Sequence, residues 1–144
     1  MDQMLTIPGA HATGDLSALQ YQAVYLTEDF GVAGITNSNV AAFAQAGIGI
    51  LQDDPAADGE PASVAILGIC RAEAGGSITQ GAYLTLDDDG KVVAGALEAD
   101  LASADRAIIG RALGDAASGD IFTIAVNFIT PVPPNIDILQ ASGD

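Results

Sequence analysis

Short runs of alternating apolar and polar residues, separated by Gly, Pro, Asp and Asn, recur along most of the chain. Runs of this length that are bounded by turn-forming residues predict β-strands. The prediction is therefore a mainly β fold, either a small β-barrel or a β-sandwich. The expected strands cover residues 20–27, 32–36, 48–52, 62–72, 83–86, 91–94, 108–113 and 121–129.

Two acidic segments mark the tightest predicted turns. Asp87-Asp88-Asp89-Gly90 ends in Asp-Gly, the strongest short signal for a hairpin. Glu28-Asp29-Phe30-Gly31 predicts a second turn. Residues 37–45 and 96–107 are rich in Ala and predict one or two short helices, although the first segment is also compatible with an extended lead into the next strand.

The two ends of the chain lack the alternation. Residues 1–18 contain Pro, Gly, Thr and Ser and predict an extended N-terminal arm. Residues 130–144 contain three prolines, which cannot donate to a sheet ladder, and predict an extended C-terminal arm. The β-rich domain would then comprise residues 19–129, a length that suits a single domain.

Two parts of the predicted domain echo each other, and both consist of a strand, an acidic loop rich in Ala and Gly, and a second strand. One explanation is chance similarity in a β-chain of low complexity. The other is that two equivalent hairpins pack about a pseudo-dyad and close a small barrel or sandwich. The echo pairs Ile48-Gly49-Ile50-Leu51, Gly59-Glu60 and Val64-Ala65-Ile66 with Ile109-Gly110-Arg111-Ala112, Gly119-Asp120 and Ile124-Ala125-Val126.

Charge excludes two classes of partner. The chain has four basic and 19 acidic residues, for a formal net charge of −15. Binding to nucleic acid or to an anionic membrane needs clustered Lys and Arg, so neither partner is expected. No apolar run approaches the roughly 18 residues of a membrane span, and the N-terminus does not resemble a signal peptide. One explanation of the acidity is solubility, and the other is that the protein must stay off packaged DNA and bind only an external surface.

The residues with chemical potential do not form a catalytic or metal-binding pattern. His11 is the only histidine and lies in the predicted arm, and Cys70 is the only cysteine and lies in an apolar run that predicts a buried, inert thiol. Zinc needs several such ligands. Asp87 and Asp89 resemble part of a calcium loop, but a solvated hairpin tip is the favoured interpretation. We predict no enzyme, no catalytic residues, no metal and no cofactor.

From about Gly14 to Phe128 the sequence resembles the phage capsid decoration, or head cement, proteins. The most specific block runs from Gly47-Ile48-Gly49-Ile50-Leu51-Gln52 through Pro55 to Gly59-Glu60. The resemblance implies a non-enzymatic virion protein that binds the outer surface of the assembled phage head and stabilises it against internal DNA pressure. It also implies the major capsid protein as partner and a homo-oligomer, a trimer or a dimer, on the capsid, after synthesis in the host cytoplasm.

Short apolar runs in the two predicted arms are candidates for the capsid contact, because an extended segment can add as a strand to a neighbouring sheet. Plain disordered tails are the alternative for these arms. Two other functions stay open, namely a tail-associated β-domain of the virion and a β-barrel module that binds a small ligand or Ca²⁺. The capsid-contact candidates are Leu5, Ile7, Pro8, Ile136, Ile138 and Leu139.

Overall fold

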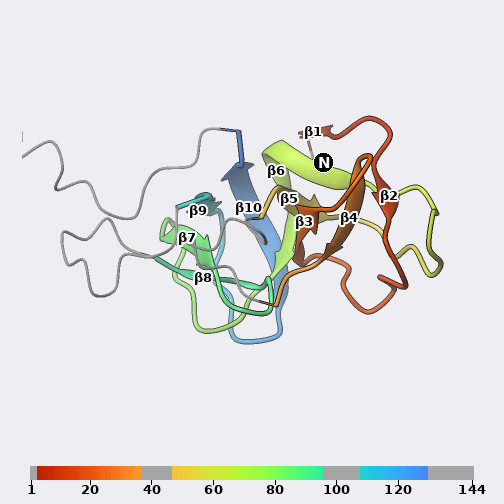
Figure 1. Ribbon diagram of the computed structural model, residues 1–144. Helices are drawn as coiled ribbons and strands as arrows, with labels where there is room; N and C mark the ends of the chain where they lie inside the picture. Colours follow the sequence, from red (N-terminus) through yellow and green to blue (C-terminus); the bar gives the residue numbers. More distant parts are fainter. Residues whose placement is uncertain (1–2, 37–46, 96–107, 130–144) are drawn as a thin grey trace, which may run out of the picture.

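The computed structural model describes residues 3–36, 47–95 and 108–129, and within these ranges the protein is mainly β, as predicted (Figure 1). Ten strands form one sheet in the order β2-β4-β3-β5-β6-β10-β9-β7-β8, and β1 pairs with β6 beside this path. The described ranges contain no helix of the length and apolarity that a membrane crossing requires. The strands are β1 (Met4–Thr6), β2 (His11–Ala12), β3 (Ala23–Leu26), β4 (Gly31–Gly34), β5 (Gly49–Leu51), β6 (Val64–Glu73), β7 (Tyr83–Leu86), β8 (Val92–Ala94), β9 (Gly110–Ala112) and β10 (Ile121–Asn127).

The predicted barrel or sandwich is not confirmed, because the strands form one open sheet. Isolated bridges and neighbouring backbone hydrogen bonds connect its two ends to the segments that flank the long central strand. His11 of β2 bridges to Pro61, just before β6, and Val92 of β8 bridges to Ala74, just after β6. Figure 1 shows the result, with β6 and β10 in the middle and the two groups of shorter strands on either side.

The hairpin predicted around residues 87–90 and the turn predicted at residues 28–31 are both confirmed. β3 and β4 pair antiparallel across the turn at residues 27–30, and β7 and β8 pair antiparallel across residues 87–91. In the first turn Asp29 and Phe30 both have positive φ, at 53° and 65°. The central strand is long, as predicted, and covers Val64–Glu73.

The predicted N-terminal arm, residues 1–18, differs from the structure over its described part. β1 pairs antiparallel with β6, and β2 pairs parallel with β4. Ala10, Ala12 and Leu16 are buried in a hydrophobic cluster together with residues of β3 to β6. The physical reason is that Ala10 and Ala12 pack in this cluster with side chains from distant strands, although alanine alone gives little strand signal.

The predicted helices at 37–45 and 96–107 lie outside the described residues. The predicted C-terminal arm, residues 130–144, also lies outside them. The described domain therefore ends at Ile129.

The sheet consists of two units with the same strand arrangement. Unit A (residues 4–36 and 47–66) has the order β4-β3-β5-β6, and unit B (residues 67–95 and 108–128) has the order β8-β7-β9-β10. The two units meet where β6 pairs antiparallel with β10. The echo in the sequence therefore reflects a repeated structural unit.

Register establishes the repeat residue by residue. Val24 lies opposite Gly34 in unit A, as Leu84 lies opposite Ala94 in unit B. Equivalent positions are thus about 60 residues apart. The buried core repeats in the same way. Unit A buries Ala10, Ala12, Leu16, Val24, Val32, Leu51, Ala62 and Val64, and the equivalent buried residues of unit B are Ala72, Ala74, Ile78, Leu84, Val92, Ala112, Phe122 and Ile124.

Candidate functional site

Leu5 and Pro8, two of the predicted contact residues, lie on the surface of the domain. Leu5 is 53% exposed in β1, directly opposite the exposed Leu67 of β6. β1 pairs with β6, and no other strand in the described part of the chain pairs with it. Leu5, Leu67 and the exposed Ile69 thus form an apolar surface on β1 and the adjacent part of β6.

The third predicted contact, Ile7, is partly buried and lines an apolar cleft of about 360 Å³. No sequence pattern indicates this cleft, since its walls come from segments far apart in the chain. Phe30 of the β3–β4 hairpin and Ile129 contribute its most exposed side chains, and Leu26 of the same hairpin is also exposed. The lining residues are Ile7, Leu26, Phe30, Ile48, Ile66, Phe128 and Ile129. The other predicted contacts, Ile136, Ile138 and Leu139, lie outside the described residues.

A second cleft, of about 460 Å³, lies on unit B along β9 and β10. Arg111 is its charged residue. The Arg111 guanidinium lies 4.8 Å from the centre of the Tyr83 ring and donates to the Gly81 carbonyl from Nε (3.1 Å) and Nη2 (2.8 Å). These contacts fix a cation at the edge of a mainly apolar surface. No sequence pattern indicated this site.

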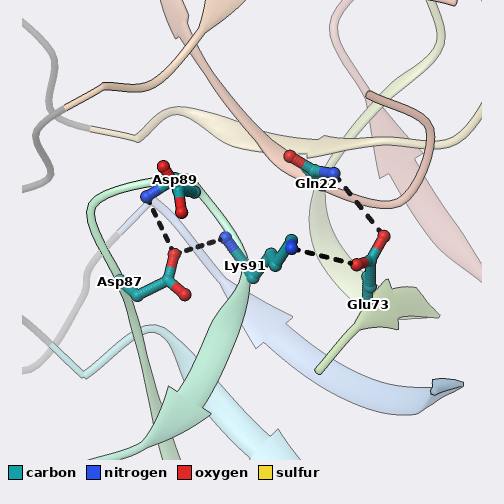
Figure 2. Close-up of polar contacts among 5 residues, drawn as sticks. All are labelled: Gln22, Glu73, Asp87, Asp89 and Lys91. Carbon is teal, nitrogen blue, oxygen red and sulfur yellow. Dashed lines mark hydrogen bonds and ion pairs between the residues drawn. The ribbon is translucent and has the colours of Figure 1, made fainter. Parts of the chain in front are cut away.

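In the acidic β7–β8 turn, the carboxylate of Asp87 accepts hydrogen bonds from backbone amides of the same turn (Figure 2). Asp87 Oδ1 accepts hydrogen bonds of 2.9 Å from the backbone amides of Asp89 and Lys91. The Lys91 ammonium lies 3.4 Å from Glu73, whose carboxylate also accepts from Gln22 of unit A. The tip is thus only partly solvated, which differs from the prediction, because Gly90 is buried against unit A.

His11 and Cys70, the only histidine and the only cysteine of the sequence, have structural positions. His11 is paired in β2, and Cys70 is fully buried in the core. The described residues contain no group of three or more His, Cys, Asp or Glu that could hold a metal ion.

Comparison with known proteins identifies the family. The family described as phage cement protein matches residues 9–128, which is most of the chain. The chain belongs to the phage cement protein family. It is thus a structural, capsid-associated protein of a bacteriophage virion, as the resemblance predicted. Among curated proteins nothing matches this chain.

A solved structure supports the fold of this cement protein. The chain is similar to the N base of the head fiber gp8.5 of bacteriophage phi29, with a TM-score of 0.54 and 16% sequence identity. The match covers 89% of this chain and 96% of that chain. At this identity the likeness concerns the fold.

Proposed function

We propose that this cement protein binds the outer surface of the assembled phage head and stabilises it against the pressure of the packaged DNA. Its partner is the major capsid protein, and it acts as a homo-oligomer, a trimer or a dimer, on the outside of the virion. The observation that carries the mode of binding is the exposed edge strand β1. Its Leu5 projects into solvent, and its outer edge has no strand partner in the described part of the chain.

An exposed edge strand offers unpaired N–H and C=O groups to a strand from a neighbouring protein. Leu5, Ile7 and Pro8 would add apolar contacts beside that pairing, and Ile136, Ile138 and Leu139 are proposed for the same role from the other end of the chain. The net charge of −15 keeps the protein away from DNA, which suits a position outside the shell.

The stabilisation follows from mass action. A protein that binds only the assembled shell lowers the free energy of that state by RT ln(1 + [L]/Kd), and many copies act together on one particle. Each bound copy therefore raises the work needed to open the shell.

Add-back to heads that lack the protein tests this proposal. Genome release on heating is followed with a DNA-binding dye, with and without the purified chain. We expect release at a higher temperature when the chain is present. Release at the same temperature in both samples contradicts the proposal.

A matched pair of variants tests the proposed contact. Leu5→Asp places a charge on β1 and should weaken binding to heads. Ile121→Asp is the control, because Ile121 is also exposed but lies opposite Glu73, roughly 20 Å along β6 from the Leu67 position that faces Leu5. If both variants bind to heads equally well, β1 is not part of the contact.

Imaging distinguishes the proposed location on the head from the alternative location on the tail. An antibody label on intact particles should decorate the head. Decoration of the tail would favour the tail-associated β-domain instead.

A further inference from the structure

Unit B covers one row of side chains on unit A. Ala23, Ile50 and Ala65 lie directly opposite one another in β3, β5 and β6, so they share one face of the sheet. All three are almost fully buried, and they belong to the same hydrophobic cluster as residues of β7, β8 and β10. This row is therefore buried at the contact between the two units.

The β7–β8 hairpin makes much of this contact. The Ala23 amide donates a hydrogen bond of 2.7 Å to the Gly90 carbonyl at the hairpin tip. Leu86, at the end of β7, lies against Gly47 of unit A and is only 5% exposed. The hairpin of unit B thus packs on the row of unit A.

Within residues 3–36, 47–95 and 108–129, no hairpin packs on the equivalent row of unit B. Tyr83, Arg111 and Ala125 occupy the positions of Ala23, Ile50 and Ala65, and the pairing of β7, β9 and β10 places them in one row. Tyr83 is 39% exposed and Arg111 is exposed. The cleft of about 460 Å³ lies along this row. We name Tyr83, Arg111 and Ala125 with this cleft the open face.

The hairpin of unit A that corresponds to the covering hairpin is also exposed. Leu26 is the equivalent of Leu86 and is 44% exposed, and Phe30 is the equivalent of Gly90 and is 62% exposed. Two large apolar side chains therefore project from the β3–β4 hairpin at the positions that unit B buries against unit A. Within one chain, the β7–β8 hairpin of unit B packs on the row of unit A. The equivalent hairpin of unit A and the equivalent row of unit B are both exposed.

We propose that the β3–β4 hairpin of a second copy of this chain docks on the open face, which is the counterpart of the row that the β7–β8 hairpin covers within one copy, and that the Phe30 side chain fills the cleft of this face instead of making the close backbone approach of Gly90. Phe30 enters the cleft beside Tyr83, and the exposed Glu28 and Asp29 of the same turn lie near Arg111. Charge complementarity favours this occupant, since Arg111 is a cation on the surface of a protein with a net charge of −15. The proposal concerns the isolated protein and does not depend on attachment to a head.

The proposed contact joins two different surfaces, so each added copy leaves the same two surfaces at its ends. Such heterologous contacts form a ring where the rotation between copies closes and an open filament where it does not, and a closed ring is the outcome proposed here. A ring of this kind presents units A and B in alternation around its circumference. This arrangement distinguishes the proposal from a two-fold contact between identical patches.

Self-association of the full-length chain tests the proposal. The mass in solution is measured by sedimentation across a concentration series. We expect the wild type to form a discrete oligomer, and Phe30→Asp to weaken self-association by about tenfold or more, as loss of an aromatic anchor does at interfaces. Phe30 has positive φ, which Asp tolerates better than Phe, so the variant should fold. Ala57→Asp, in an exposed loop outside both surfaces, is the control with the same added charge and should keep the wild-type mass.

Disulfide trapping tests which surfaces meet. Glu28→Cys and Gln80→Cys are made in separate chains, one on the β3–β4 turn and one on the lining of the open face, while Cys70 is buried and does not compete. Oxidation should give cross-linked dimers in the mixture of the two variants and little in either variant alone. Cross-links within one variant alone would indicate a two-fold contact and overturn the proposal.

Other occupants give different results. A wild type that is a single chain at all concentrations overturns self-docking, and loss of head binding by Phe30→Asp would then assign the surface to the capsid. Loss of the oligomer on removal of residues 130–144, with no effect of Phe30→Asp, would assign the contact to the C-terminal segment and overturn the proposal as well.

Discussion

Gly90 in the β7–β8 turn lies against the backbone of Ala23 in β3, which belongs to the other unit. The Ala23 amide donates to the Gly90 carbonyl at 2.7 Å. Gly90 has a φ of +84°, and a Cβ added there would lie 2.8 Å from the Ala23 carbonyl oxygen. The left-handed backbone and the close approach both require glycine.

Gly90→Ala is therefore expected to lower the free energy of unfolding by about 2–4 kcal/mol, because the side chain adds backbone strain and pushes the two units apart. Urea denaturation followed by circular dichroism measures the change.

Two other glycines allow the cost of backbone strain to be measured apart from the cost of the contact with Ala23. Gly59 and Gly119 have φ values of +87° and +89°, but a Cβ at either would have nothing within 4 Å. Alanine at these positions should cost only the backbone strain, about 1–2 kcal/mol. If Gly90→Ala costs no more than these two variants, the contact between the turn and Ala23 does not contribute to stability.

Asp87 is expected to stabilise its turn without a metal ion. Asp87→Ala removes the acceptor of the Asp89 and Lys91 amides and should cost about 1–2 kcal/mol. Asp89→Ala, an exposed neighbour, should change stability by less than about 0.5 kcal/mol. Both are measured by thermal unfolding with and without calcium. A calcium-dependent rise in Tm that disappears in Asp87→Ala would favour the calcium-binding module instead.

The elements that sequence predicted well are those specified by local chemistry. Asp89-Gly90 ends a turn that only a few residue types allow, and the β7–β8 hairpin formed where expected. The echo between residues 48–66 and 109–126 was visible because Gly49 and Gly110 face a carbonyl of the next strand in both units. These requirements lie within a few residues or recur in the sequence.

The N-terminal segment was mispredicted because its structure depends on distant partners. His11 pairs with Gly31 and bridges to Pro61, which are far from it in the chain. Ala10 and Ala12 alternate, yet two alanines carry little strand propensity. Their burial depends on the hydrophobic cluster of unit A, and no local pattern indicates that cluster.

The candidate surfaces were also invisible in the sequence. Leu26 and Leu86 occupy equivalent positions in equivalent strands, and their local patterns are alike. One is exposed and the other is buried, because only the second hairpin packs against another unit. Which copy of a repeated pattern stays open is decided by the packing of the units.

Cys70 is expected to be unreactive in the folded protein. Its side chain is fully buried in the cluster that spans both units, opposite Ile124 of β10. A thiol reagent should label it only when the domain opens, so the labelling rate should rise with urea in parallel with unfolding. Rapid labelling in native buffer contradicts the described packing around β6.

The two units are expected to unfold together, and a pair of equivalent glycines tests this. A Cβ at Gly49 would lie 2.6 Å from the Ala65 carbonyl oxygen, and one at Gly110 would meet the equivalent oxygen of Ala125. Each substitution to Ala should cost about 2–4 kcal/mol, because the obstacle is backbone that cannot move aside. Since β6 belongs to both units, either variant should shift one cooperative transition to lower urea.

Gly114→Ala is the control for these two variants. A Cβ at Gly114 meets open space, so this variant should keep a free energy of unfolding within about 1 kcal/mol of the wild type. Two separate transitions in Gly49→Ala or Gly110→Ala would show that each unit folds alone.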